Sequence, residues 1–307
     1  MAAAGHGVQA TGAFSYLLSQ DYEKIFFDDY AHTPEQFSKH AKFMTMNASD
    51  WKEAMLAGFG QAPTIQEGNP VTFDYLKQGY PKTVTPTKYG IGFQITEEMY
   101  DDDLTGHMKK GPSIIAKSMA WAREVQWWSL LNDGDDTHTS ADGQYIFATA
   151  HPGLRTATGT QANKPASAGA LSLTTYEAAL QAFMGWVDDA GYPVDYLPYV
   201  LIIPPNLVWI ARELQLSELK PGVANNDINP VNVEEHAGMS YFVSRWLTST
   251  TAWWILGKNH DLRFMWRKKV KFQSGDDFAT GNALFKSTMR FATACYDWRG
   301  AYMNAGA

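Results

Sequence analysis

The sequence predicts an α+β fold whose copies assemble through a projecting β-ribbon. Three observations indicate this: a helix-free stretch at residues 61–96 with a period of two, one long amphipathic helix, and short strands that return late in the 307 residues. Charged residues make up 19% of the chain, below the usual quarter, and aromatic residues make up 14%. That balance suits a protein whose surface is partly covered by partner subunits.

Both arms of the predicted ribbon alternate apolar and polar residues, the first at residues 71–75 and the second at residues 89–95. Residues 78–81 have turn chemistry and are predicted to join the arms. At about 3.3 Å per residue, arms of ~15 residues reach roughly 50 Å. A compact chain of this length has a radius of gyration of only about 19 Å, and an isolated ribbon is marginal in water. We therefore expect the ribbon to lie on a neighbouring copy.

Helices are expected on either side of the ribbon. One is expected at residues 15–30. Thr96, followed by two acids, is a predicted N-cap. The longest helix is predicted at residues 111–132, with proline in its first turn. Its predicted buried stripe consists of Ile114, Trp121, Val125 and Trp128, which follow one another at intervals of seven, four and three residues. Ile115, Met119 and Ala122 are predicted to widen this stripe.

A second unit is predicted to follow a Ser/Gly/Ala-rich linker at residues 166–170. Its first helix is expected to start with a capping box at residues 174–177 and to end at Gly191. The helix is predicted to bury Tyr176, Leu180, Phe183 and Val187. The remaining expected elements are a buried strand at 199–203, a helix from Pro204, a long loop at 220–238 and strands at 241–257, 264–270 and 284–303.

The charge balance weighs against binding to phosphate backbones. There are 25 Lys and Arg against 32 Asp and Glu, which gives a net charge of −7, and the pI is about 5.6. Sequence-independent binding to nucleic acid needs clustered cations. The single cysteine, Cys295, is expected to be a buried structural thiol. We see no signal peptide and no apolar run of ~18 residues, so synthesis in a reducing cytosol is expected.

Segments that resemble catalytic or ligand-binding motifs lack essential parts. Gly5 and Gly7 do not follow a predicted strand, whereas a dinucleotide-binding site requires a strand directly before its glycines. Residues 133–138 lack the glycine and the final acid of a calcium loop. His151 is interpreted as a turn residue rather than a base, and the two Trp pairs, 127–128 and 253–254, as buried rather than sugar-stacking. We expect no catalytic residues, no cofactor and no metal, and we predict that the protein is not an enzyme.

Several segments, taken in order, resemble a known family. They are Tyr89-Gly-Ile-Gly-Phe-Gln-Ile-Thr-Glu-Glu-Met99 with Asp101-Asp102-Asp103, Phe147-Ala-Thr-Ala-His-Pro152, Tyr199-Val-Leu-Ile-Ile-Pro-Pro205, Asp277-Phe-Ala-Thr-Gly-Asn282, and Met289-Arg-Phe-Ala with Asp297-Trp-Arg-Gly300. With the order of elements, they make the chain similar to the major capsid protein of tailed bacteriophages, the Hong Kong 97 fold, and to Mu-like prophage head subunits. The resemblance covers nearly the whole chain.

The resemblance implies an α+β capsid fold in five segments. Residues 1–50 would be an N-terminal arm, 51–95 an extended β-hairpin loop, and 96–170 with 263–307 a peripheral domain containing the long spine helix. Residues 171–262 would be the axial α/β domain. Candidate inter-subunit contacts are Phe73, Tyr75, Lys77, Lys82, Lys88, Asn225, Asn226, Asp276, Asp277 and Asn282.

Some relatives crosslink a loop lysine to an asparagine with the help of a glutamate seven residues further on. Here Asn282 matches the asparagine, but the acid position is Met289. A thioether cannot accept a proton, so no crosslink is expected. The chain begins almost directly with its arm, so scaffolding is expected to be a separate protein or absent.

The implied function is a major capsid protein that self-assembles into hexamers and pentamers of an icosahedral shell around double-stranded DNA. Expected partners are further copies of the chain, a portal, and scaffolding or decoration proteins where the particle uses them. The expected location is the virion capsid, assembled in the host cytoplasm without a membrane. Two alternatives stay open: an encapsulin-type compartment shell with the same fold, and a Trp-rich carbohydrate-binding module of a different class.

Overall fold

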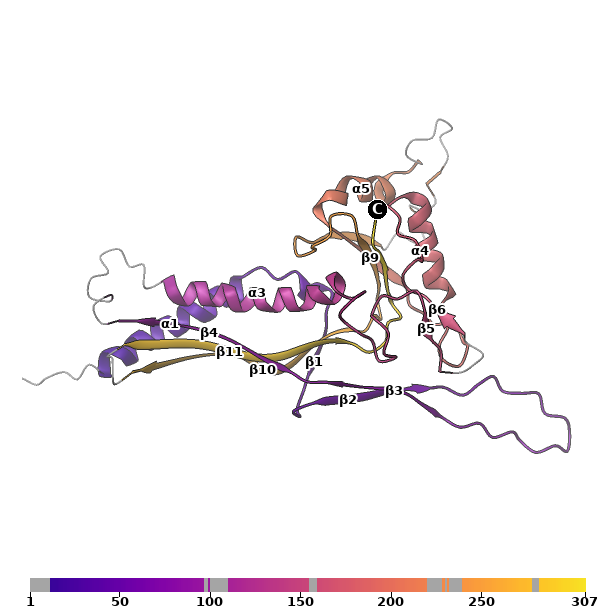
Figure 1. Cartoon of the computed structure of the whole chain (residues 1–307), viewed down its shortest axis with the longest axis horizontal. Helices are drawn as coiled ribbons and strands as arrows, with labels where there is room; N and C mark the ends of the chain where they lie inside the picture. Colours follow the sequence, from indigo (N-terminus) through magenta and orange to yellow (C-terminus); the bar gives the residue numbers. More distant parts are fainter. Residues whose placement is uncertain are drawn as a thin grey trace, which may run out of the picture. The chain divides into compact units, whose positions relative to one another are not determined.

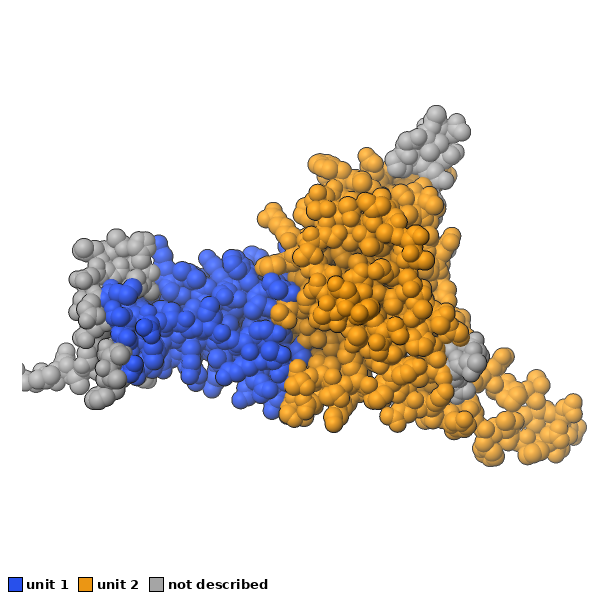
Figure 2. Space-filling model, viewed as in Figure 1, with its two compact units in different colours: residues 1–38, 86–125, 266–292 blue, residues 39–85, 126–265, 293–307 orange. Residues whose placement is uncertain are grey.

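The computed structural model describes residues 12–96, 99, 110–154, 159–219, 228, 229, 231, 239–277 and 282–307. The described chain is mixed α+β and divides into two compact units (Figures 1 and 2). Unit 1 comprises residues 1–38, 86–125 and 266–292, and unit 2 comprises residues 39–85, 126–265 and 293–307.

The described elements are, in chain order, α1 (Gly12–His32), the 3₁₀ helix η1 (Phe37–Lys39), β1 (Lys42–Thr45), β2 (Trp51–Ala57), β3 (Lys77–Val84), β4 (Thr87–Ile95), α3 (Gly111–Asn132), β5 (His151–Pro152), β6 (Thr160–Gln161), α4 (Leu173–Gly185), β7 (Pro198–Ile203), the 3₁₀ helix η4 (Pro205–Leu207), α5 (Val208–Leu216), β8 (Ser240–Val243), β9 (Trp253–Gly257), β10 (Leu262–Asp276), β11 (Ala283–Cys295) and β12 (Ala301–Asn304).

Unit 1 is a sheet with helices packed on it. β11 lies between β10 and β4, and β11 and β4 pair antiparallel. α1 packs on this sheet through aromatic rings: the centroids of Phe26 and Phe272 are 4.9 Å apart, and those of Tyr22 and Phe285 are 5.1 Å apart. The helix predicted at residues 15–30 and the strand predicted at residues 89–95 are confirmed.

The long helix α3 has the predicted bounds, but only part of the predicted stripe is buried. Ile114, Trp121 and Val125 are exposed, Trp121 by 54%. Ile115 and Met119, which are predicted to widen the stripe, are buried, and so is Trp128. The helix is apolar around most of its circumference, so spacing alone could not distinguish one face from the other.

Two charged residues of α3 select the buried face within unit 1. Arg123 pairs with Glu35, and its guanidinium lies 4.4 Å from the centroid of the Tyr30 ring. Glu124 accepts hydrogen bonds from the backbone N–H groups of Gln36, at 2.5 Å, and Phe37, at 3.2 Å. Because buried charges are costly unless paired, these contacts fix which side of the helix faces inward.

Unit 2 contains a second sheet in the order β12–β9–β7–β8, in which β7 and β8 are parallel and the other pairs antiparallel. α4 and α5 pack against it, as Figure 1 shows. Tyr176, Phe183, Leu201 and Trp253 are among the buried residues of this core. The buried strand predicted at residues 199–203 is confirmed as β7.

The ends of α4 differ from the prediction. The N-cap is Ser172, whose Oγ accepts from the N–H of Thr175 at 3.3 Å, while Thr175 Oγ1 accepts from the N–H of Ser172 at 3.0 Å. The capping box therefore begins two residues earlier than predicted. The helix ends at Gly185 rather than Gly191, which lies in a later turn with a φ of +91°. Thr96 does act as predicted, because its Oγ1 accepts from the N–H of Met99 at 3.2 Å.

The predicted pairing of the ribbon is wrong. β3 pairs antiparallel with β2, not with β4, so residues 78–81 lie inside a strand rather than in a turn. Their glycine and proline serve a β-bulge: the register shifts between Ala54 and Leu56, and a Cβ at Gly79 would lie 2.7 Å from the carbonyl oxygen of Met55. Glycine and proline are common at bulges, where a turn signal is easily misassigned.

Candidate functional site: the β2–β3 ribbon and its loop

The ribbon of unit 2 consists of β2 and β3 and continues into a long loop. The last paired residues are Ala57 and Lys77, so residues 58–76 connect the two strands. Every residue from 61 to 78 is exposed. Figures 1 and 2 show the ribbon and loop extending away from the rest of unit 2. We call residues 58–76 the extended loop.

Local hydrogen bonds shape the extended loop. The N–H of Asn69 donates to the carbonyl of Gln66 at 3.1 Å, and Gly68, the third residue of this turn, has a φ of +85°. A positive φ at that position favours glycine. Closer to the strands, the N–H of Gly60 donates to Asp74 Oδ2 at 2.9 Å, which ties the outgoing and returning segments together. The true turn is therefore at residues 66–69.

The extended loop exposes a high density of large apolar side chains. Phe73 is 93% exposed and Tyr75 76%; among the aromatic side chains whose burial the structure describes, only Trp209 comes close. The exposed apolar residues of the loop are Phe59, Ile65, Val71, Phe73, Tyr75 and Leu76. Exposed apolar side chains concentrated in one segment indicate an interaction site. The two predicted contact aromatics thus lie where a partner could bury them.

The three predicted contact lysines have different surroundings. Lys77 Nζ donates to the carbonyl of Leu154 at 2.6 Å although the side chain is exposed. Lys82 is half-buried, and its Nζ donates to the carbonyls of Thr139 and Cys295 inside the same subunit. Lys88 is exposed on β4. Sequence patterning could not distinguish the lysine that is held internally from the two that are exposed.

The other predicted contacts lie in different places. Asp276 is exposed at the end of β10, and the N–H of Asp277 donates to the carbonyl of Asn282 at 2.9 Å. These three residues thus come together in unit 1. Asn225 and Asn226 lie outside the described residues, as does most of the loop predicted at 220–238.

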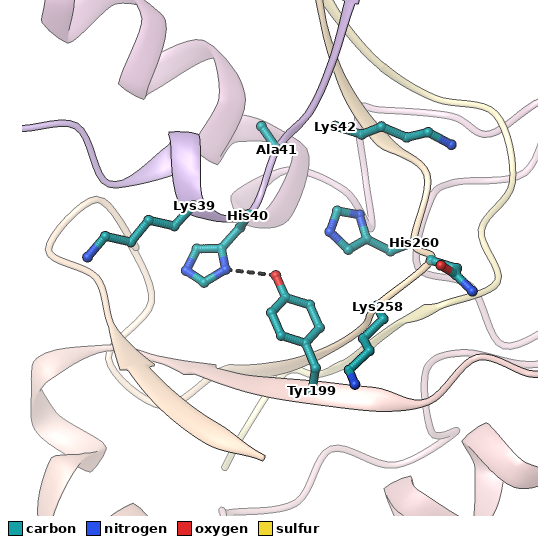
Figure 3. Close-up of a pocket in the computed structure, with 8 residues that line it drawn as sticks. Lys39, His40, Ala41, Lys42, Tyr199, Lys258 and His260 are labelled. Atoms are coloured by element: carbon teal, nitrogen blue, oxygen red, sulfur yellow. Dashed lines mark hydrogen bonds between the residues drawn. The ribbon is translucent and has the colours of Figure 1, made fainter. Parts of the chain in front are cut away.

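A pocket of unit 2 holds two buried histidines (Figure 3). Its volume is about 560 Å³, and its lining includes Lys39, Lys42 and Lys258. His40 Nδ1 lies 2.9 Å from the hydroxyl of Tyr199. The lysine side chains in Figure 3 point in different directions and do not converge on one point.

Burial controls the titration of these pocket residues. It lowers the pKa of His260 to about 4, and together with Lys39 it lowers the pKa of His40 to about 4. It raises the pKa of Tyr199 to about 12. General acid–base catalysis works best with a pKa near the operating pH. These shifts move all three groups away from neutrality, so the pocket is poorly suited to proton transfer at pH 7.

The predicted turn residue His151 is instead fully buried. Its Nδ1 lies 2.6 Å from Asp142 Oδ2, and its Nε2 lies 3.1 Å from Asn163 Oδ1. The ring stacks on Trp298 with centroids 4.2 Å apart. Burial alone would raise the pKa of Asp142, but hydrogen bonds from His151 and Ser140 lower it. The network joins Asp142, His151 and Asn163.

The cysteine and the two Trp pairs are buried, as the sequence predicts. Cys295 is buried, and burial raises the pKa of its thiol well above the usual value. The indoles of both Trp pairs are buried, so neither pair offers a sugar-stacking face. Within the described ranges, no group of three metal-ligating side chains comes together. None of the described helices combines the length and apolar character needed to cross a bilayer.

Among the solved structures similar to this chain are proteins of phage capsids and of a virus-like particle. The chain is similar to a protein of the mature capsid of bacteriophage PhiM1, with a TM-score of 0.63, 9% identity, and coverage of 89% of this chain and 87% of that one. It is also similar to the procapsid of bacteriophage JBD30 (TM-score 0.51, 16% identity, 96% and 76% coverage). A third similar structure is the virus-like particle from Pyrococcus furiosus, with a TM-score of 0.51 and 11% identity over 93% of this chain and 98% of that one. The fold is the Hong Kong 97 type.

The sequence itself matches a family. The model of the phage capsid protein family matches residues 79–304, most of the chain, and the chain belongs to this family. It is a major capsid protein, a structural protein that forms an icosahedral shell. The family favours a phage head over the encapsulin-type alternative. None of the curated proteins compared matches the chain.

Proposed function

We propose that each copy places its extended loop on a neighbouring copy, and that copies joined in this way form the hexamers and pentamers of the head. The observation that carries this proposal is the exposure of the loop's apolar side chains, above all Phe73 and Tyr75. Burying apolar surface contributes about 25 cal/mol per Å². A loop that is exposed in one subunit and rich in aromatics is therefore suited to bury its surface between subunits.

The head is proposed to enclose double-stranded DNA without sequence-specific binding and without a chemical reaction. The net charge of −7 supports this, because a shell of net-negative subunits gains little from binding phosphate. The further proposed partners are a portal and, where the particle uses them, scaffolding or decoration proteins. Assembly is proposed to take place in the host cytoplasm.

We assign the segments as follows. Residues 1–50 form the N-terminal arm, 171–262 the axial domain, and 96–170 with 263–307 the peripheral domain. The extended hairpin predicted at residues 51–95 is narrowed to residues 51–84, because β4 pairs with β11 in the sheet of unit 1.

A loop replacement tests the proposed contact. Since Ala57 and Lys77 are directly opposite each other, residues 58–76 can be replaced by Asn-Gly, a pair that closes a two-residue hairpin. We expect a folded, soluble protein that does not form closed shells in electron microscopy. A matched control keeps the loop and its aromatics but carries Thr72→Ser. Normal shells from the shortened protein would refute the proposed role of the loop.

A further inference from the structure

The base of the ribbon carries two opposite charges that face each other but bind elsewhere. Glu53 of β2 and Lys82 of β3 are directly opposed in the antiparallel register. Opposed residues of a ribbon project from the same face. Here that face lies against the rest of unit 2, and each side chain finds its partners there rather than across the strands.

Glu53 is held by a two-pronged contact with Arg263 of β10. Arg263 Nη1 lies 2.5 Å from Glu53 Oε2, and Nη2 lies 3.1 Å from Oε1. The indole N–H of Trp51 donates to the same carboxylate at 3.0 Å. Arg263 Nε donates to Asp261 Oδ1 at 2.6 Å, which orients the guanidinium from its other side. The hydrogen bonds from Arg263 are the main reason that the pKa of Glu53 is lowered.

Lys82 is held by backbone carbonyls. Its Nζ donates to the carbonyl of Thr139 at 2.5 Å and to that of Cys295 at 3.0 Å. Burial lowers the pKa of this ammonium group. A partly desolvated lysine with two carbonyl acceptors makes charge-assisted hydrogen bonds, which are stronger than neutral ones.

One aromatic ring contacts both cations. The guanidinium carbon of Arg263 lies 4.5 Å from the centroid of the Tyr296 ring, and Lys82 Nζ lies 5.9 Å from the same centroid. Both distances fall within the ~6 Å range of cation–π attraction. Tyr296 is buried. It thus links the contact of β2 and the contact of β3 into one cluster, which we call the ribbon anchor: Glu53, Lys82, Arg263 and Tyr296.

We propose that the ribbon anchor fixes the direction of the ribbon in the free subunit and so preorganises the extended loop for a neighbouring copy. Two strands alone are marginal in water, and a loop that must first be ordered loses binding free energy to that ordering. A ribbon anchored on both strands avoids part of this loss. The inference rests on the proposed function of the loop, but the anchor itself can be tested without assembly.

The test measures amide hydrogen exchange in free full-length subunits, at a concentration below that at which shells form. The variants are Lys82→Met, which keeps the alkyl chain but removes the donors, and Glu53→Gln, which removes the charge at similar size. Charge-assisted bonds contribute enough that we expect ~10-fold faster exchange in β2 and β3 for either variant. Exchange in β9 of the core sheet should not change. Light scattering should show slower shell formation.

Lys52→Met is the matched control, because Lys52 is exposed and is the β2 neighbour of Glu53, so that its side chain projects from the opposite face. It should behave as wild type. The proposal is overturned if ribbon exchange is unchanged in both variants, if β9 accelerates equally, or if shells form at the wild-type rate. If one variant fails to fold, the other decides the question. A failure of the loop proposal looks different, because the Asn-Gly replacement would then still close shells.

Discussion

Removing the Phe73 side chain from the returning segment of the extended loop should weaken assembly without affecting the fold. In Phe73→Ser, a side chain that is 93% exposed in the subunit loses its apolar surface. An aromatic side chain buries roughly 150 Å² or more, worth about 4 kcal/mol at 25 cal/mol per Å². Ordering costs reduce this to about 2 kcal/mol for each loop contact. At 1.4 kcal/mol per factor of ten, the free subunit concentration at equilibrium should rise roughly 30-fold.

Sedimentation velocity of subunits and particles over a range of concentrations measures that rise directly. Thr72→Ser, one residue away and also exposed, serves as the control and should leave the free subunit concentration unchanged. Thermal unfolding of both variants should match wild type, because Phe73 makes little contact with its own subunit. An unchanged free subunit concentration for Phe73→Ser would refute the assignment of the loop as an inter-subunit contact.

Three further predictions concern stability and covalent chemistry. The pKa of His260 falls from 6.5 to about 4 on folding, so the unfolded chain binds more protons between these two pH values. The stability of the fold should therefore drop as the pH falls through this window, by on the order of 3 kcal/mol per histidine. His260→Gln should flatten the pH dependence of thermal unfolding, and an unaltered slope would contradict this. Asn163→Ala removes buried hydrogen bonds to the carbonyls of Ile146, at 2.7 Å, and Ala301, at 3.0 Å. The free energy of unfolding, measured by urea titration, should fall by about 3 kcal/mol. A loss below about 1 kcal/mol would argue against the network. Particles should run on denaturing gels as single 34.2 kDa chains, since buried Met289 cannot act as a base; a covalent ladder would disprove this.

Local patterns predicted elements well where burial and periodicity agree. β7 was predictable because a run of apolar residues is flanked by prolines, and α3 because Gly111 and Pro112 precede a long helical pattern. The buried face of α3 was not predictable. It depends on the partners of Arg123 and Glu124, which lie 87 or 88 residues earlier in the sequence.

The candidate site was predictable in kind but not in detail. The exposure of Phe73 and Tyr75 was predictable because the alternating segment belongs to a ribbon too long to be buried within one subunit. The pairing failed because Gly79 and Pro81 serve a bulge, and bulge and turn use the same residues. The internal role of Lys82 depends on the carbonyl groups of Thr139 and Cys295, which lie 57 and 213 positions further along the chain. No local sequence pattern encodes such contacts.

A reconstruction of the assembled shell by cryo-electron microscopy, at a resolution that shows side chains, tests the central claim most directly. The prediction is that residues 58–76 of every copy lie on an adjacent copy, with the Phe73 ring buried against it. Density showing this loop in solvent, or folded onto its own subunit, would contradict the account.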